Sequence, residues 1–414
     1  MKKLIVTLGA LLVSASMTYA QKESDFYKDK IKQVSKTVDL VKDYKVNNKD
    51  NQDDSDKLQK AIDDMTSLKN GGRINIGAGT YYFGSIEVKS NVHIVISKDA
   101  LIYPVAPEKK NKNYGIFDFG TNGNYVENLS VRGDKGQYTV DVSKAENKRV
   151  RVFSMNNAHN FLIADMNCID DNSRFSSITM GYAKYNGKYV MSDNGVVKNC
   201  RIEKAHYGYG LVQSQALKNV FFKDLWGDGG VTLRLETGLK KMNNAQTGGN
   251  HDIYAKNIYC QNGNASVMIS PHAIKNGHVE VDGVEAVNTG FAVRIDKGYA
   301  SKDQKKLNLK PGYYANTSIV KNVKATYGDN AQVKPKHFKY ITCYAKPLIH
   351  SKPHPDGESY PAPSVAAILY RADGNADNAN GYYKVEISNV EAIGFPYQKK
   401  AVINESDEVV NCEQ

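Results

Sequence analysis

A short unit recurs along this chain and limits what the chain can fold into. Each copy begins with a polar or small residue, usually Asn, followed by an apolar residue, a variable residue and a second small or apolar residue. The copies begin at Asn128, Asp165, Asn199, Asn219, Asn257, Gly283, Asn322 and Asn389. Asn tolerates the left-handed backbone of a tight turn, so each copy predicts a turn beside a short strand. Strand units that recur with loops of variable length between them predict a solenoid of stacked coils.

The segment before the first copy predicts a helix that covers the open end of the solenoid. Asp54, Ser55 and Asp56 would cap this helix, because side-chain oxygens accept hydrogen bonds from the first backbone amides. The apolar residues that follow share one side of the helix: Leu58, Ala61, Ile62 and Met65. We expect a lead-in segment over residues 21–52 and a single β-solenoid domain over residues 53–414.

Residues 334–363 interrupt the repeat and contain six prolines, which predicts a long loop insertion. Such loops in a compact domain carry function or lack order. The aromatic and basic residues of this loop predict that it forms the wall of a cleft. The alternative is a surface loop without a function. The residues in question are Phe338, Tyr340, Tyr344 and Lys346.

Residues 1–20 predict a secretory signal peptide, in which Lys2 and Lys3 precede a short apolar run. The run is too short to span a bilayer, and no later stretch is apolar enough, so we expect a secreted protein without a membrane partner. The full chain has a formal net charge of +11. The basic residues are spread along the chain, which argues against nucleic acid. An anionic polysaccharide is the expected partner, and the protein is expected to be a monomer or a weak homo-oligomer.

The five cysteines are widely spaced and include no Cys-x-x-Cys pair. This spacing predicts neither a zinc site nor a disulfide framework. Cys168, Cys200 and Cys260 occupy the apolar positions of the repeat, which predicts small buried core residues. Cys343 and Cys412 lie outside the repeat units.

The stretch from Gly229 to Gly238 carries the strongest chemical signal in the sequence. Between the bracketing glycines, apolar and polar residues alternate, and side chains alternate across a strand. The buried side is predicted to take Val231, Leu233 and Leu235. The outer side is predicted to take Thr232, Arg234 and Glu236. This outer side would form the floor of a polar cleft, and an ordinary strand with a surface ion pair is the alternative.

Later and earlier strands predict further polar side chains on the same outer side. Strands of neighbouring coils stack about 4.8 Å apart, so equivalent positions form a column along the solenoid. The column contains Gln213, Glu236, His272, Arg294 and Asp296. An Arg binds sulfate or carboxylate through a bidentate fork, so Arg234 and Arg294 are candidate substrate-binding residues. Tyr209, close to Gln213, is a third, and Glu236 is a candidate general acid.

The segment from Asp53 to Tyr82 resembles the entry to right-handed parallel β-helix polysaccharide enzymes. It combines an acidic cap, a Leu-x-x-Ala-Ile helix and the run Gly-Gly-x-h-x-h-x-x-Gly-x-Tyr, where h is apolar. Lyases and hydrolases share this motif, so it implies a fold and not a reaction. The implied fold class is all-β, a right-handed parallel β-helix with an N-terminal capping helix.

The central block resembles the iota-carrageenases of glycoside hydrolase family 82. The resemblance rests on Gly-Gly-Val-Thr-Leu-Arg-Leu-Glu-Thr, on a Gln about two dozen residues before the Glu and on a His some three dozen after it. The family consists of secreted β-helix enzymes that cut β-1,4 links in a sulfated galactan with inversion. The resemblance implies that Glu236 is the general acid and that Gln213 and His272 belong to the active site.

The chain departs from the family pattern at Gly238. The family has Glu-x-Asp on this strand, with the Asp as general base, whereas Gly238 follows Glu236 by two residues here. Inverting hydrolysis uses two carboxyl groups roughly 6.5 to 9.5 Å apart. Asp296, two coils away and therefore about 10 Å distant, is a candidate base. Asp228, near the start of the same strand, is the alternative candidate.

Three functions therefore stay open at this stage. The favoured one is an endo-acting, inverting glycoside hydrolase that cleaves a sulfated galactan. A β-helix lyase on a uronic-acid polymer would instead use a Lys, Arg or His base, often with Ca²⁺. A non-catalytic glycan-binding β-helix is the third, and Gly238 is the residue that favours it. The hydrolase requires no cofactor and no catalytic metal, although the sequence allows a structural Ca²⁺ or another ion.

Overall fold

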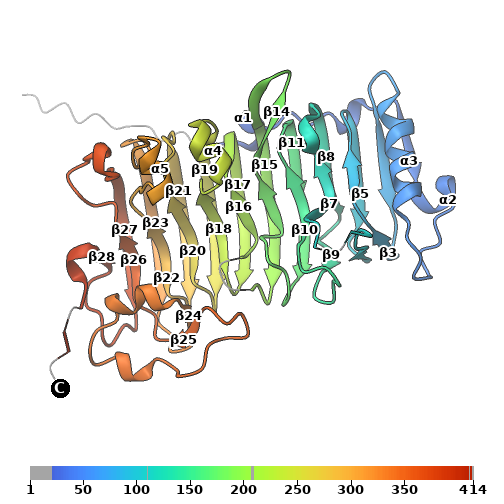
Figure 1. Cartoon of the computed structure of the whole chain (residues 1–414). Helices are drawn as coiled ribbons and strands as arrows, with labels where there is room; N and C mark the ends of the chain where they lie inside the picture. The colour runs from blue at the N-terminus through green and yellow to red at the C-terminus, as the bar shows by residue number, and fades with distance from the viewer. Residues whose placement is uncertain (1–20, 110, 207–208, 410, 413–414) are drawn as a thin grey trace, which may run out of the picture.

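The computed structural model describes residues 21–109, 111–206, 209–409 and 411–412, so the predicted signal peptide lies outside the described residues. Two parallel sheets run along the length of the molecule (Figure 1). Neighbours in the path of the larger sheet are β1 (Lys36–Asp39), β2 (Gly72–Ile76), β5 (Val92–Ser97), β8 (Val126–Asp134), β11 (Ala158–Ala164), β15 (Lys188–Glu203), β17 (Ala216–Asp228), β19 (Gly249–Gln261), β21 (Val279–Val287), β23 (Ser318–Thr326) and β27 (Val385–Ile393).

The smaller sheet lies on the other side of the core. Its path runs through β4 (Ile86–Val88), β7 (Tyr114–Phe119), β10 (Val150–Met155), β13 (Ile178–Met180), β16 (Val212–Ser214), β18 (Val231–Glu236), β20 (Ala265–Ser270), β22 (Phe291–Ile295), β26 (Ala366–Tyr370) and β28 (Val402–Ile403). Shorter strands join the larger sheet at its side: β3 (Gly79–Phe83), β6 (Ala100–Pro104), β9 (Tyr138–Asp141), β12 (Met166–Ile169) and β14 (Tyr182–Tyr185).

The chain alternates between the sheets, and the strands along each of these two paths pair in parallel with their equivalents in the next coil. In the larger sheet, for example, Val220 on β17 pairs with Ile253 on β19. In the smaller sheet, Leu233 on β18 pairs with Val267 on β20. The apolar side chains of both sheets meet in one continuous core cluster. The predicted all-β parallel β-helix is therefore confirmed.

The recurring Asn marks a bend in the coil, in most copies within a strand of the larger sheet. The first residue of every repeat unit has a positive φ: Asn128, Asp165, Asn199, Asn219, Asn257, Gly283, Asn322 and Asn389. Several of these side chains also bond from coil to coil. The amide of Asn128 donates to Asn91 Oδ1 over 3.2 Å, and that of Asn160 donates to Asn128 Oδ1 over 2.8 Å. The repeat thus sets both the turn conformation and a polar ladder along the molecule.

Helix α3 (Ser55–Thr66) covers the first coil, as predicted (Figure 1). Its four apolar residues Leu58, Ala61, Ile62 and Met65 are buried. Asp54 is the N-cap residue by backbone position, but its carboxylate makes no capping hydrogen bond. The carboxylate of Asp53 instead accepts from the amide of Ser55 over 2.9 Å.

The segment over residues 21–52 lies against the outer side of the larger sheet and then contributes a strand. Helix α1 (Glu23–Phe26) places Phe26 against Phe221 and Tyr254, with ring centroids 5.3 Å apart in both pairs. Strand β1 then pairs with β2, and helix α2 (Leu40–Tyr44) packs against α3. The segment predicted as a lead-in is therefore packed onto the β-helix.

Residues 331–365 form the insertion over the smaller sheet. Strands β24 (Ala331–Val333) and β25 (Tyr360–Ala362) pair antiparallel at its base. Its interior side chains join a second apolar cluster with Val231, Met268 and Leu369 of the smaller sheet. No helix within the described ranges is long and apolar enough to cross a membrane.

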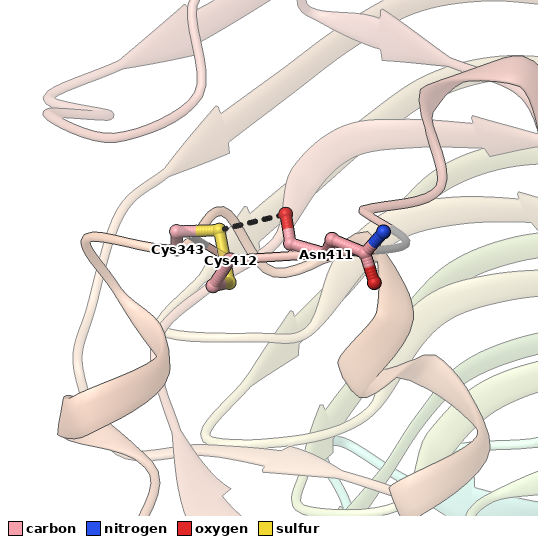
Figure 2. The surroundings of a disulfide bond; sticks show 3 residues. All are labelled: Cys343, Asn411 and Cys412. Atoms are coloured by element: carbon pink, nitrogen blue, oxygen red, sulfur yellow. Dashed lines mark hydrogen bonds between the residues drawn. A yellow bond between two sulfur atoms is a disulfide. The ribbon is translucent and has the colours of Figure 1, made fainter. Parts of the chain in front are cut away.

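The cysteine spacing predicts no disulfide framework, and it does not indicate the one disulfide that the structure holds. Cys343 in the insertion is bonded to Cys412 near the C-terminus (Figure 2). The two are 69 residues apart in sequence, and folding places their Cα atoms 5.4 Å apart. Cys168, Cys200 and Cys260 are free and buried, as predicted.

Candidate active site

Strand β18 presents Arg234 and Glu236 on the outer face of the smaller sheet. Leu233 and Leu235 point into the core, as the alternation predicts. The prediction is wrong at the start of the strand. Val231 joins the apolar cluster beneath the insertion, and Thr232 is fully buried, with its hydroxyl donating to the carbonyl of Tyr259 over 2.7 Å. Thr232 is therefore a packing residue and does not line the cleft.

Three side chains surround the carboxylate of Glu236. Gln213 Nε2 on β16 donates to Glu236 Oε2 over 3.0 Å, and Arg234 Nη2 contacts the same oxygen. His272 Nε2 lies 3.4 Å from Glu236 Oε1. The Glu236 side chain is 18% exposed, so one edge of this group stays open to a ligand. The structure thus brings together four of the predicted site residues.

The surroundings of Glu236 act on its pKa in opposite directions. Burial raises it, while the charge of Arg234 and the contact with His272 lower it, and the net pKa lies below the ordinary value of 4.5. Glu236 is therefore a carboxylate in this structure. A general acid must carry a proton, so a bound ligand would have to weaken the Arg234–Glu236 pair before Glu236 could protonate a leaving group.

Asp296 lies two strands from Glu236, paired with arginines. Its amide donates to the carbonyl of Ile269 over 2.9 Å, which sets it level with Ser270, the residue paired with Glu236. Two strand spacings separate the two carboxylates at the backbone by about 10 Å. Arg294 Nη2 lies 3.0 Å from Asp296 Oδ2, and Arg371 Nη1 lies 3.3 Å from Oδ1.

These ion pairs set the protonation of Asp296. Burial raises its pKa, whereas the charges of Arg294 and Arg371 lower it, and the net pKa lies below 3.8. Asp296 is ionised and held in place by two cations. Arg294 is itself almost fully buried, with a side chain 4% exposed.

The structure does not bring Asp228 to this group. Asp228 ends β17 in the larger sheet, where its Oδ1 accepts from Asn262 Nδ2 of the next coil over 2.9 Å. Glu236 stands five residues beyond Val231, about 17 Å along the strand from its start. The alternative assignment of Asp228 as base is therefore wrong, because a turn at Gly229 and Gly230 separates it from the outer face of β18.

The imidazole ring of His272 fills the space next to Gly238. A Cβ built on Gly238 would meet His272 Nε2 at 2.9 Å and Cε1 at 3.0 Å. A larger side chain there would have to move the imidazole away from Glu236. Glycine at position 238 therefore leaves the space that the imidazole of His272 occupies beside Glu236.

A cavity of about 150 Å³ opens beside Glu236 towards the insertion. Tyr209, Arg234 and Arg294 line it, as predicted for substrate-binding residues. Two further residues, Lys334 and Lys336 of the insertion, line this cavity and were not among the residues predicted from the sequence. Their Lys-Pro-Lys spacing at the start of the loop was the available signal. Phe338 and Tyr340, predicted for the cleft wall, pack instead in the apolar cluster below the loop.

The described residues contain no cluster of three or more His, Cys, Asp or Glu side chains with metal-site geometry. Around Glu236 lie one amide, one imidazole and the guanidinium of Arg234. The adjoining cavity adds Arg294, Lys334 and Lys336, together with one acid, Glu358, which pairs with Lys334. That set favours an anionic ligand over a metal ion.

Comparison with known proteins places this chain in the class of β-helix glycoside hydrolases. The chain is 34% identical to the iota-carrageenase of Zobellia galactanivorans, over 86% of this chain and 82% of that protein. It is 31% identical to the iota-carrageenase of Alteromonas macleodii, over 97% of this chain and 93% of that protein. The chain belongs to the iota-carrageenase family, glycoside hydrolase family 82.

A solved structure agrees with this assignment. It carries the name 1,3-alpha-1,4-beta-D-galactose-4-sulfate-3,6-anhydro-D-galactose-2-sulfate 4 galactohydrolase and superposes with a TM-score of 0.88 at 32% identity. The match covers 95% of this chain and 96% of that one. No protein-family model matches the sequence.

Proposed function

We propose that this protein hydrolyses the β-1,4 linkages of iota-carrageenan, a galactan sulfated on both sugars of its repeat. The observation that carries the proposal is the placement of Glu236. Its carboxylate is held by Gln213, Arg234 and His272 beside a cavity lined by further cations. The family relatives and the galactohydrolase structure support the same substrate class.

In this proposal Glu236 donates a proton to the leaving glycosidic oxygen. The substrate itself supplies the change that protonation requires. A sulfate that enters the cavity engages Arg234, and the arginine then stabilises the Glu236 carboxylate less. The pKa of Glu236 rises on binding, so the acid becomes competent only when a sulfated sugar is present.

Asp296 is the carboxylate that we propose for activation of water. Its backbone separation from Glu236, two spacings of about 4.8 Å, lies close to the upper limit of the roughly 6.5 to 9.5 Å between the carboxyl groups of inverting enzymes. Inversion of the anomeric centre and endo action are part of the proposal. Arg294 and Arg371 keep Asp296 ionised and lower its pKa. Substrate contacts with these arginines would weaken the ion pairs, so the pKa of Asp296 would rise and its carboxylate would become a stronger base.

The remaining parts of the proposal follow from the chemistry and the sequence. The reaction uses carboxylates and water and requires no cofactor, although a structural cation is compatible with it. The protein is exported by the signal peptide at residues 1–20 and meets its polymer outside the cell. It acts as a monomer or a weak homo-oligomer.

The test compares the mature protein with its Glu236→Gln form on iota-, kappa- and lambda-carrageenan, alginate and pectate. New reducing ends and the ultraviolet absorbance of unsaturated sugars are followed together. We expect reducing ends from iota-carrageenan without absorbance, and their loss in Glu236→Gln by about a thousandfold. Absorbance from a uronate polymer would replace the proposal with a lyase, and binding without turnover would replace it with a glycan-binding protein.

A further inference from the structure

The last coil of the smaller sheet brings a third carboxylate into line with the candidate active site. Strand β22 pairs in parallel with β26, and β26 pairs in parallel with β28 (Figure 1). In this register Asp296 follows β22 and Arg371 follows β26 at equivalent positions. Glu405, in the 3₁₀ helix Glu405–Asp407, is the equivalent residue after β28. The three charged side chains therefore lie level on successive coils.

Arg371 divides its guanidinium between the two carboxylates beside it. Its Nη1 lies 3.3 Å from Asp296 Oδ1, and its Nη2 lies 3.1 Å from Glu405 Oε1. Its Nε is buried and has no hydrogen-bond partner among the described residues. An arginine frequently binds a single carboxylate through two parallel N–H···O bonds. Glu405 therefore competes with Asp296 for the donors of Arg371.

A second cation and a tyrosine hydroxyl hold Glu405 in place. Lys297 Nζ lies 2.7 Å from Glu405 Oε2, and the Tyr382 hydroxyl donates to the same oxygen over 3.2 Å. Lys297 Nζ also donates to the Tyr382 hydroxyl over 3.0 Å. Burial raises the pKa of Glu405, whereas its contacts with Lys297 and Arg371 lower it, and the net pKa lies below 4.5. Glu405 is therefore ionised and fixed in position.

The backbone of Asp296 is held by contacts that do not involve Glu405. Its carbonyl accepts a hydrogen bond from the Tyr383 hydroxyl over 2.8 Å, and Tyr383 is fully buried. The amide of Arg371 donates to the carbonyl of Ile295 over 2.8 Å. A change at residue 405 is therefore expected to alter where the Arg371 guanidinium binds and to leave both backbones in place.

The division of Arg371 decides how well Asp296 can act as a base. Each carboxylate oxygen has two lone pairs, and a base needs one of them free to accept a proton from water. Arg294 Nη2 occupies Oδ2 of Asp296 over 3.0 Å, and Arg371 Nη1 approaches Oδ1. A second donor from Arg371 would take a further lone pair and lower the pKa of Asp296 again, which makes a weaker base.

We propose that Glu405 is a positioning residue that binds one Nη group of Arg371 and so keeps Asp296 able to accept a proton from water. Glu405 contacts neither the water nor the sugar in this role, because it acts through Arg371. The inference rests on the proposed function, which assigns Asp296 as the base.

The test compares Glu405→Gln with the matched control Glu408→Gln on iota-carrageenan. Both carboxylates belong to the C-terminal segment, and their side chains are 27% and 31% exposed. Glu408 instead pairs with Lys339 and accepts from the Tyr340 hydroxyl over 3.1 Å. The control therefore removes an equivalent charge from the same segment.

The inference predicts an effect on kcat and not on KM. We expect kcat of Glu405→Gln to fall about tenfold, because the base is weakened and not removed. KM should stay at the wild-type value, and Glu408→Gln should match wild type in both constants. An unchanged kcat in Glu405→Gln, an equal loss in the control, or a change in KM alone would overturn the inference.

An Asp296→Asn background tests whether Glu405 acts through Asp296. Residues that act through one group have effects that do not add. Adding Glu405→Gln to Asp296→Asn is therefore expected to lower kcat no further. A further loss of about tenfold in the double variant would show that Glu405 acts on another group and would refute the inference.

A crystal structure of Glu405→Gln gives a result that does not depend on activity. We expect the Arg371 guanidinium to place two nitrogens on the carboxylate of Asp296. Arg371 in its wild-type position would refute the inference even if Asp296 proves to be the base. Arg371 bound twice to Asp296, in a protein whose Asp296→Asn form is fully active, would support the positioning by Glu405 and refute Asp296 as the base.

Discussion

The two outer faces of this β-helix differ in what covers them. On the larger sheet, Leu162, Val196, Phe221 and Tyr254 lie level on adjacent strands and form an apolar row. Helix α1 closes that row with Phe26 and Tyr27. On the smaller sheet, the insertion covers the later coils and leaves the earlier ones open, and Glu236 stands where the cover ends. The site therefore arises from an incomplete cover, not from a different kind of strand.

The largest expected effect comes from the covered part of the smaller sheet. Arg294→Met leaves Asp296 buried with only Arg371 as partner, and breaking a buried ion pair costs about 4 kcal/mol. Chemical denaturation measures this loss in the free energy of unfolding. The double variant Arg294→Met/Asp296→Asn should recover part of it. If the single variant is as stable as wild type, the pair does not hold this region together.

Removing the cover of the larger sheet should lower stability without touching the site. Phe26→Ala deletes a ring that is 3% exposed and contacts two other rings, which costs about 3 kcal/mol. The activity of Phe26→Ala on iota-carrageenan, per folded molecule, should match that of wild type. The control Leu348→Ala removes an exposed apolar side chain and should match wild type in both stability and activity. A loss of kcat in folded Phe26→Ala would mean that the two faces are coupled.

The covered face also buries a histidine. His93, 1% exposed on β5, bonds to Ser130 Oγ over 2.9 Å beside Arg132, which pairs with Asp29. Burial, and secondly the charge of Arg132, lower the pKa of His93 from 6.5 to about 4. Between pH 6.5 and 4, His93 is therefore protonated in the unfolded chain but neutral in the folded protein. The free energy of unfolding falls as the pH drops through this range.

This loss amounts to about 3 kcal/mol from His93 alone. His93→Gln should flatten the fall in melting temperature between pH 7 and pH 4.5, while other titrating groups act equally in both proteins. An identical pH dependence in wild type and variant would show that His93 takes up its proton in the folded state.

The smallest expected effect concerns the disulfide of the insertion. Cys343→Ser frees the C-terminal end, while Lys334 and Lys336 stay in place through β24, β25 and the apolar cluster. We expect a loss of about 2 kcal/mol in thermal unfolding, with KM unchanged. Cys412→Ser should behave identically. A raised KM in both would show that the disulfide shapes the cavity.

The features that could be predicted from sequence depend on residues within a single coil. The positive φ of Asn128 and its equivalents follows from a residue type, and the buried side of α3 follows from helical spacing. Arg234 and Glu236 follow from alternation within one strand. Register between neighbouring coils then places Gln213 beside Glu236.

What could not be predicted depends on segments that meet only after folding. Val231 and Thr232 break the alternation at the start of β18, because Val231 packs beneath the insertion while Thr232 bonds to the carbonyl of Tyr259 in the larger sheet. Asp228 was misplaced because two glycines turn the chain between sheets. The Cys343–Cys412 bond joins parts of the chain that no local pattern relates.

The most direct test of this account is a crystal structure of Glu236→Gln with an iota-carrageenan oligosaccharide. We expect a galactan chain along the smaller sheet, with its glycosidic oxygen about 3 Å from the residue 236 side chain. One sulfate should contact Arg234 or Arg294, which line the cavity beside Glu236. An oligosaccharide bound on the larger sheet, or bound with no sugar near residue 236, would contradict it.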